Sequence, residues 1–85
     1  MPCISQFFGI LIYMYYNDHA PPHFHALYGK YEIKVRIDDG DVQGQFPRRA
    51  LSHVLEWYNL HKNELSENWD LARERRPLSR IEPLE

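Results

Sequence analysis

Three histidines stand within seven residues of one another, at His19, His23 and His25. Asn17 and Asp18 come directly before the first of them. Neutral imidazoles bind zinc and similar divalent ions, and a carboxylate can complete such a site. One interpretation is therefore a metal site formed by the three histidines, with Asp18 as an additional ligand and zinc as the cofactor.

Two of the histidines are expected on the first strand of a hairpin. Gly29 followed by Lys30 favours a tight turn between strands at residues 23–28 and 31–38, because glycine takes a positive φ at little cost. A two- or four-residue connection pairs side chains on one face as follows: His23 with Arg36, and His25 with Lys34. A three-residue turn would shift this register by one and place each histidine opposite an apolar residue.

This pairing changes the chemistry that we expect. Cations about 5 Å from an imidazole disfavour a bound dication. A phosphate would instead find Lys34 and Arg36 as donors, with His23 and His25 as a general acid and base. The residues expected to line such a site are Tyr13, Tyr15, Asn17, Asp18 and His19. The second interpretation is thus a phosphodiester site with no cofactor, similar to that of a metal-independent ribonuclease.

The first half of the chain predicts an antiparallel sheet. Residues 4–16 are rich in β-branched and aromatic side chains, and Gly9 marks a bend between two strand segments. Pro21 and Pro22 require a loop before the hairpin. A turn at residues 38–41 and a short segment to Gln45 follow the hairpin.

The second half predicts two helices. Pro47 suits the first position of a helix whose apolar face is formed by Ala50, Leu51, Val54, Leu55 and Tyr58. Asn63 is expected to end that helix and to cap a second one over residues 64–76, which Pro77 stops. The tail after Pro77 is expected to be extended and docked. We predict one α+β domain over residues 1–85, in which the helices cover one face of the sheet and leave the histidine face exposed.

Composition excludes several classes of protein. The chain has 85 residues, a formal net charge of -2 and one cysteine, Cys3, which cannot form an internal disulfide. The longest apolar stretch, residues 7–16, is far shorter than the ~20 residues of a membrane-spanning helix. We therefore expect a cytoplasmic protein with no membrane association. The near-neutral charge argues against non-specific coating of nucleic acid and leaves a local phosphate site open.

Segments spread over nearly the whole length of the sequence carry a resemblance to one known family. The most specific segment is His-Ala-Pro-Pro-His-Phe-His at residues 19–25. Further similarity lies at Ile4-Ser5, Phe7-Phe8-Gly9-Ile10, Met14-Tyr15-Tyr16-Asn17-Asp18, Pro47-Arg48-Arg49-Ala50-Leu51, Leu55-Glu56-Trp57, Leu60-His61, Glu64-Leu65, Asn68-Trp69, Pro77-Leu78 and Ile81-Glu82-Pro83-Leu84. With these segments the sequence resembles a small bacterial domain of unknown function, the DUF4160 family.

The resemblance implies a role as the toxin of a type II toxin–antitoxin pair, with a small antitoxin protein encoded alongside as its partner. Many small toxins act on RNA, which agrees by analogy with a local phosphate site. The rival interpretation is a non-catalytic protein-interaction domain whose aromatic and histidine face contacts a partner. An exposed sheet face on so small a domain also favours homo-oligomers.

Overall fold

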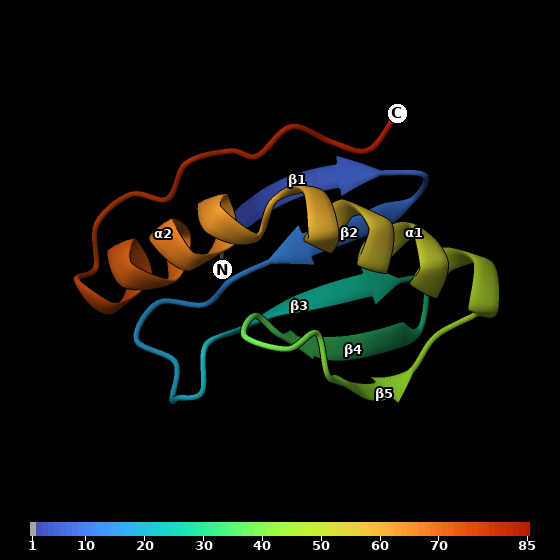
Figure 1. The fold of residues 1–85 in the computed structure, drawn as a ribbon, viewed down its shortest axis with the longest axis horizontal. Coiled ribbons are helices and arrows are strands. Elements are labelled where there is room, and N and C mark those ends of the chain that lie inside the picture. The colour runs from blue at the N-terminus through green and yellow to red at the C-terminus, as the bar shows by residue number, and fades with distance from the viewer. Residues whose placement is uncertain (1) are drawn as a thin grey trace.

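Five antiparallel strands follow one another in the computed structural model, which describes residues 2–85. They are β1 (Cys3–Phe7), β2 (Ile10–Tyr13), β3 (His23–Tyr28), β4 (Tyr31–Arg36) and β5 (Val42–Gln45). Each strand pairs with its neighbour in sequence, so the sheet order is β1-β2-β3-β4-β5 (Figure 1). The predicted antiparallel sheet is confirmed.

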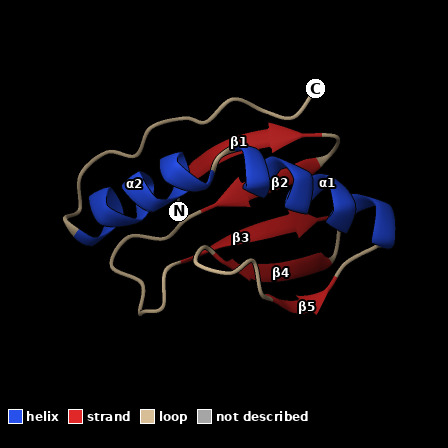
Figure 2. Ribbon diagram, viewed as in Figure 1, coloured by secondary structure: helices blue, strands red, loops and turns tan. Residues whose placement is uncertain are grey.

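Two helices, α1 (Arg48–Leu60) and α2 (Lys62–Arg73), follow the strands and cover one face of the sheet (Figure 2). This arrangement confirms the predicted α+β fold with C-terminal helices. The junction differs from the expectation at Asn63, because the chain bends at His61, which has φ -128° and ψ 27° and donates its backbone N–H to the Tyr58 carbonyl. Among the described residues, neither helix has the length and apolar character needed to cross a membrane.

The core lies between the sheet and the helices. Alternate residues of the central strands point toward it, among them Phe24, Ala26, Ile33 and Val35. The expected apolar face of α1 omitted Trp57, which is fully buried and packs against the rings of Phe7 and Phe24. The helix buries this additional side because both the sheet and the C-terminal tail lie against it.

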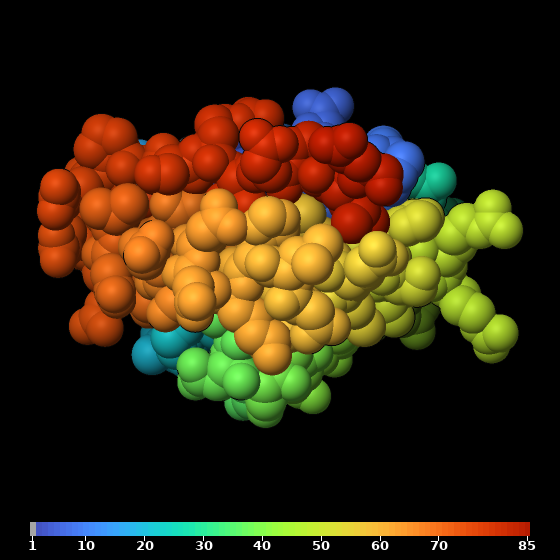
Figure 3. All heavy atoms as spheres, turned by 45° about the horizontal axis from the view of Figure 1, so that its top comes forward, coloured from blue at the N-terminus to red at the C-terminus, as the bar shows by residue number. Residues whose placement is uncertain are grey.

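The tail is docked, as predicted. Asn68 of α2 is almost fully buried, and its side-chain amide donates to the Ser79 carbonyl and accepts from the Ser79 N–H. The Ile81 N–H donates to the Ile4 carbonyl on β1 at 2.8 Å. Figure 3 shows the tail, in red, lying along the two helices. The tail therefore ties α2 to the β1 edge of the sheet.

A glycine in β5 provides a test of the sheet geometry. Gly44 has φ +111°, and a Cβ at this position would lie 2.6 Å from the carbonyl oxygen of Glu32 on β4. We expect Gly44→Ala to lower the free energy of unfolding by about 3 kcal/mol, measured by urea denaturation. The matched control is Gly29→Ala, where φ is +57° and no atom lies within 4 Å, with an expected loss of about 1 kcal/mol. Equal losses in the two variants would contradict this geometry.

Candidate functional site

The register of the hairpin agrees with the sequence prediction. His23 pairs with Arg36 and His25 with Lys34 across β3 and β4. His25 also pairs with Tyr13 on β2, and Lys34 pairs with Gln43 on β5, so these four residues form one row across the sheet. The turn at residues 29–30 thus places both histidines on the sheet face away from the core residues Phe24 and Ala26.

The prediction that the histidine face is exposed is wrong at the histidines themselves. His23 is 7% exposed and His25 is 6% exposed. The loop over residues 14–22 folds across them, so the Tyr15 ring lies 4.4 Å from the His25 ring, centroid to centroid. The Trp69 ring of α2 lies 5.3 Å from the His23 ring. These contacts bury two side chains that the alternation of β3 alone would expose.

Backbone hydrogen bonds hold this loop in place. The Asn17 N–H donates to the Ala72 carbonyl in α2 at 3.2 Å, and the Met14 N–H donates to the Pro2 carbonyl at 3.2 Å. Asn17 has φ +55°, a left-handed conformation that asparagine tolerates better than most residues. The turn that follows carries Asp18 back toward β3.

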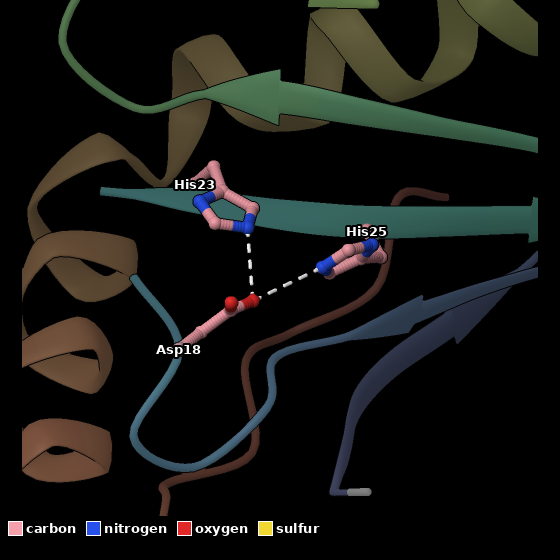
Figure 4. A group of neighbouring side chains, drawn as sticks. All are labelled: Asp18, His23 and His25. Carbon is pink, nitrogen blue, oxygen red and sulfur yellow. Dashed lines mark hydrogen bonds and ion pairs between the residues drawn. The ribbon is translucent and has the colours of Figure 1, made fainter. Parts of the chain in front are cut away.

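Asp18 lies between the two buried histidines (Figure 4). Its Oδ2 atom is 3.0 Å from Nε2 of His23 and 3.4 Å from Nε2 of His25. Burial raises the pKa of Asp18, but the backbone N–H of His19 and the imidazoles of His25 and His23 outweigh burial and hold that pKa below its ordinary value. We call Asp18, His23 and His25 the histidine centre.

The outer nitrogens of both imidazoles face acceptors. Nδ1 of His23 is 2.8 Å from the carbonyl oxygen of Pro21, and Nδ1 of His25 is 3.3 Å from Oε2 of Glu32. The Pro21 carbonyl can only accept a hydrogen bond, so Nδ1 of His23 is assigned a hydrogen and donates it. His25 instead faces a carboxylate at both ring nitrogens, because its Nε2 also lies within hydrogen-bond distance of Oδ2 of Asp18, at 3.4 Å. Each Nε2 is therefore the atom that turns toward Asp18.

Arg36 and Lys34, the two cations expected opposite the histidines, differ in whether a carboxylate pairs with them. Nε and Nη2 of Arg36 donate to the carboxylate of Asp39 at 3.0 and 2.9 Å, and Nη2 also lies 3.8 Å from Oδ2 of Asp41. Lys34 is exposed and has no ion pair within residues 2–85. The positive charge beside His23 is thus largely offset, whereas the charge beside His25 is not.

The remaining predicted residues lie around the centre. Tyr13 is half-buried in β2, and burial and then the negative charges of Glu32 and Asp18 raise the pKa of Tyr15, which keeps its phenol protonated. The His19 side chain is 83% exposed, and its Nδ1 lies 3.1 Å from Oδ1 of Asp18, the oxygen that faces away from the other histidines. His19 therefore does not belong to the convergent group.

The sequence interpretation omitted Glu32 and Trp69. Glu32 could have been found, because it alternates with Lys34 and Arg36 along β4 and so shares the histidine face. Trp69 could not, since its contact with His23 depends on where α2 packs. The acidic turn at residues 38–41 was interpreted only as a turn, although two of its carboxylates pair with Arg36.

A pocket adjoins the histidine centre on the side of His23. It has a volume of about 160 Å³ and opens over β4 and β5. Its lining residues are His19, Ala20, Pro21, His23, Lys34, Arg36, Asp41 and Gln43. The buried centre thus has one wall in common with a space that a ligand can enter.

Comparison with known families gives one match. The family model of the domain of unknown function DUF4160 covers residues 9–70, which is more than half of the chain and includes the whole histidine centre. Comparison with curated proteins and with solved structures gives no match. The segment that matches runs from the turn before β2 into α2, so strands β2 to β5, the covering loop and the histidine centre lie within the family domain. The chain belongs to the DUF4160 family of domains of unknown function.

Proposed function

We propose that this protein acts on the phosphodiester backbone of RNA, in the cytoplasm, as the toxin of a toxin–antitoxin pair. The observation that supports this proposal most is the pocket beside His23, whose walls include Lys34 and Arg36. A pocket that combines a lysine, a guanidinium and a histidine suits a phosphate group better than it suits a neutral ligand.

Lys34 is the main phosphate-binding residue in this proposal. Its ammonium has no carboxylate partner within residues 2–85, so it keeps its charge available to a ligand. Gln43 pairs with Lys34 across β4 and β5 and adds an amide donor. Arg36 contributes less, because two of its nitrogens already donate to Asp39.

RNA carries its own nucleophile in the 2′-hydroxyl. Attack of that oxygen on the adjacent phosphorus breaks the bond to the 5′-oxygen, so one proton must leave the 2′-hydroxyl and one must reach the departing oxygen. The histidine centre borders the pocket through His23 and supplies the groups that handle this charge and these protons. Cleavage then yields a cyclic phosphate and a free 5′-hydroxyl.

Expression in a bacterial host that lacks the antitoxin tests the proposal. We expect the wild type to arrest growth and to fragment total RNA, and Lys34→Gln to lower the rate of RNA cleavage about 10-fold, since the phosphate loses its charged donor. The double variant His23→Ala/His25→Ala should lose at least 100-fold. Lys30→Gln is the matched control, because Lys30 lies at the far end of the hairpin, over the Tyr31 ring.

A second candidate function predicts the opposite result. Phe8, Tyr28 and Tyr31 are 54%, 37% and 37% exposed. We call them the aromatic end, because Phe8 and the β3–β4 turn lie at the end of the sheet opposite His23. A non-catalytic domain that contacts a partner protein would use this surface. Toxicity that survives in the histidine double variant and is lost in Phe8→Ser would favour this candidate and overturn the RNA proposal.

A further inference from the structure

We infer that the histidine centre binds a divalent transition-metal ion, with Nε2 of His23, Nε2 of His25 and a carboxylate oxygen of Asp18 as its ligands. The inference deepens the proposed function, on which its catalytic meaning rests, by assigning a cofactor to the same site. The binding of the ion itself follows from the geometry of this centre and does not depend on an RNA substrate.

The three donor atoms already converge. They come from β3 and from the covering loop, and they all lie within 4.8 Å of one another. Zinc bonds of 2.0–2.1 Å in tetrahedral geometry separate neighbouring ligand atoms by about 3.3 Å. The distances of 3.0 and 3.4 Å from Asp18 Oδ2 to the two Nε2 atoms are close to that spacing. The ion would fit with small side-chain adjustments.

The hydrogen positions leave room for a cation. Because Nδ1 of His23 donates to the Pro21 carbonyl, the tautomer with a single ring hydrogen directs the Nε2 lone pair of His23 at the carboxylate of Asp18. Lone pairs and a carboxylate oxygen at 3 Å repel one another unless a positive charge lies between them. Nε2 of His23 is buried and makes no hydrogen bond within residues 2–85, even though it lies 3.0 Å from Asp18 Oδ2. A metal ion would give Nε2 of His23 a partner and would replace the hydrogen bond between Nε2 of His25 and Oδ2 of Asp18.

The surroundings of both imidazoles are typical of metal ligands. Histidine ligands usually donate their second ring N–H to a carbonyl or a carboxylate, which fixes the tautomer and the ring orientation. The Pro21 carbonyl has this position for His23, and the Glu32 carboxylate has it for His25. Each imidazole is thus oriented by its own partner before any ion binds.

Carboxylates offset most of the positive charge near the histidine centre. Asp18 and Glu32 place two carboxylates on the imidazoles, and the Arg36 guanidinium is engaged by Asp39 and Asp41. Lys34 alone contributes an uncompensated positive charge on this face. The balance of charge at the centre therefore favours a dication, contrary to the interpretation drawn from the pairing alone.

Two imidazoles and one carboxylate select the class of ion. This donor set suits zinc, iron(II), cobalt(II) and nickel(II), whereas calcium and magnesium prefer oxygen ligands. Three protein ligands leave at least one position for water or substrate. With His23 forming a wall of the phosphate pocket, the ion would polarise a phosphoryl oxygen or lower the pKa of a bound water.

Metal titration of the purified protein tests this inference. Protein without a histidine tag is stripped with a chelator and titrated with Zn²⁺ in a competition assay, with Mg²⁺ as a second titrant. We expect one zinc per chain and no competition from Mg²⁺. Asp18→Asn and His25→Ala should each weaken zinc binding at least 100-fold, whereas the control His53→Ala, whose imidazole stacks on Phe8, should change it less than 3-fold.

Three results would overturn the inference. The first is less than one tenth of an equivalent of zinc on the wild type. The second is a loss in Cys3→Ser or His19→Ala as large as that in Asp18→Asn, because the ligand set would then differ. The third is unchanged zinc binding in an Asp18→Asn protein whose circular dichroism shows it to be folded. Zinc binding without toxicity would support the metal site and overturn the RNA proposal. Toxicity without zinc binding would support the RNA proposal and overturn the metal site.

Discussion

Saturating zinc is expected to raise the midpoint of thermal unfolding of the metal-free protein by about 15–30 °C. The histidine centre exists only in the folded chain, because Asp18 reaches His23 and His25 through the covering loop. Free zinc at 1,000 times its dissociation constant stabilises the native state by about 4 kcal/mol. A domain of this size shifts its midpoint by about 4–8 °C per kcal/mol. Circular dichroism at increasing zinc concentration measures the shift.

The control for this experiment is Asp18→Asn, which keeps the shape of the side chain and removes its charge. At the same zinc concentration, this variant, which is expected to bind at least 100-fold more weakly, should show no more than about a third of the wild-type shift. Mg²⁺ should leave the midpoint of the wild type unchanged. A wild-type midpoint that stays constant at zinc concentrations that fill the site would show that the folded and unfolded chains bind the ion equally. That result would contradict a site assembled by tertiary structure.

Trp57→Ala is expected to lower the free energy of unfolding by about 3–5 kcal/mol. Trp57 is 0% exposed and packs on Phe7 and Phe24, and its indole N–H donates to the Glu82 carbonyl in the tail at 2.8 Å. The substitution removes a core aromatic side chain and one of the hydrogen bonds of the tail. A domain of this length has a total stability of roughly 5–10 kcal/mol, so the variant should be close to its unfolding limit.

Urea denaturation of the purified variants measures this loss. Leu60→Ala at the end of α1 is the matched control, because Leu60 is 65% exposed and its truncation should change stability by less than about 0.5 kcal/mol. Trp57→Phe should retain part of the stability, since it keeps an aromatic ring and loses the donor to Glu82. Similar stabilities for Trp57→Ala and Leu60→Ala would contradict the central position of Trp57 in the core.

The sheet and its register follow from local sequence. The Gly29 turn and the alternation of apolar residues on both sides of it align β3 with β4, which pairs His23 with Arg36 and His25 with Lys34. The helices follow from the periodicity of their apolar residues, although the bend at His61 in place of Asn63 did not. Short connections make this part predictable, because neighbouring strands have few other ways to pair.

The interpretation of the site as an exposed cationic face followed from the same pairing, and it lacked three features of the tertiary structure. Asp39 and Asp41 turn back onto Arg36, Glu32 contacts His25, and Asp18 lies between the imidazoles. None of these contacts can be derived from strand alternation. Each one depends on how a turn or loop outside the pairing is placed.

The sequence by itself thus determined the α+β fold, the hairpin register and the presence of histidines on one face of the sheet. Only the tertiary structure decided that these histidines are buried and converge on a carboxylate. The physical reason is that α2 holds the loop over residues 14–22 through the hydrogen bond from Asn17 to Ala72 and packs Trp69 on His23. In both contacts the two residues are more than forty positions apart in the sequence. Strand pairing is a local property, whereas the chemistry of this centre depends on contacts between distant segments.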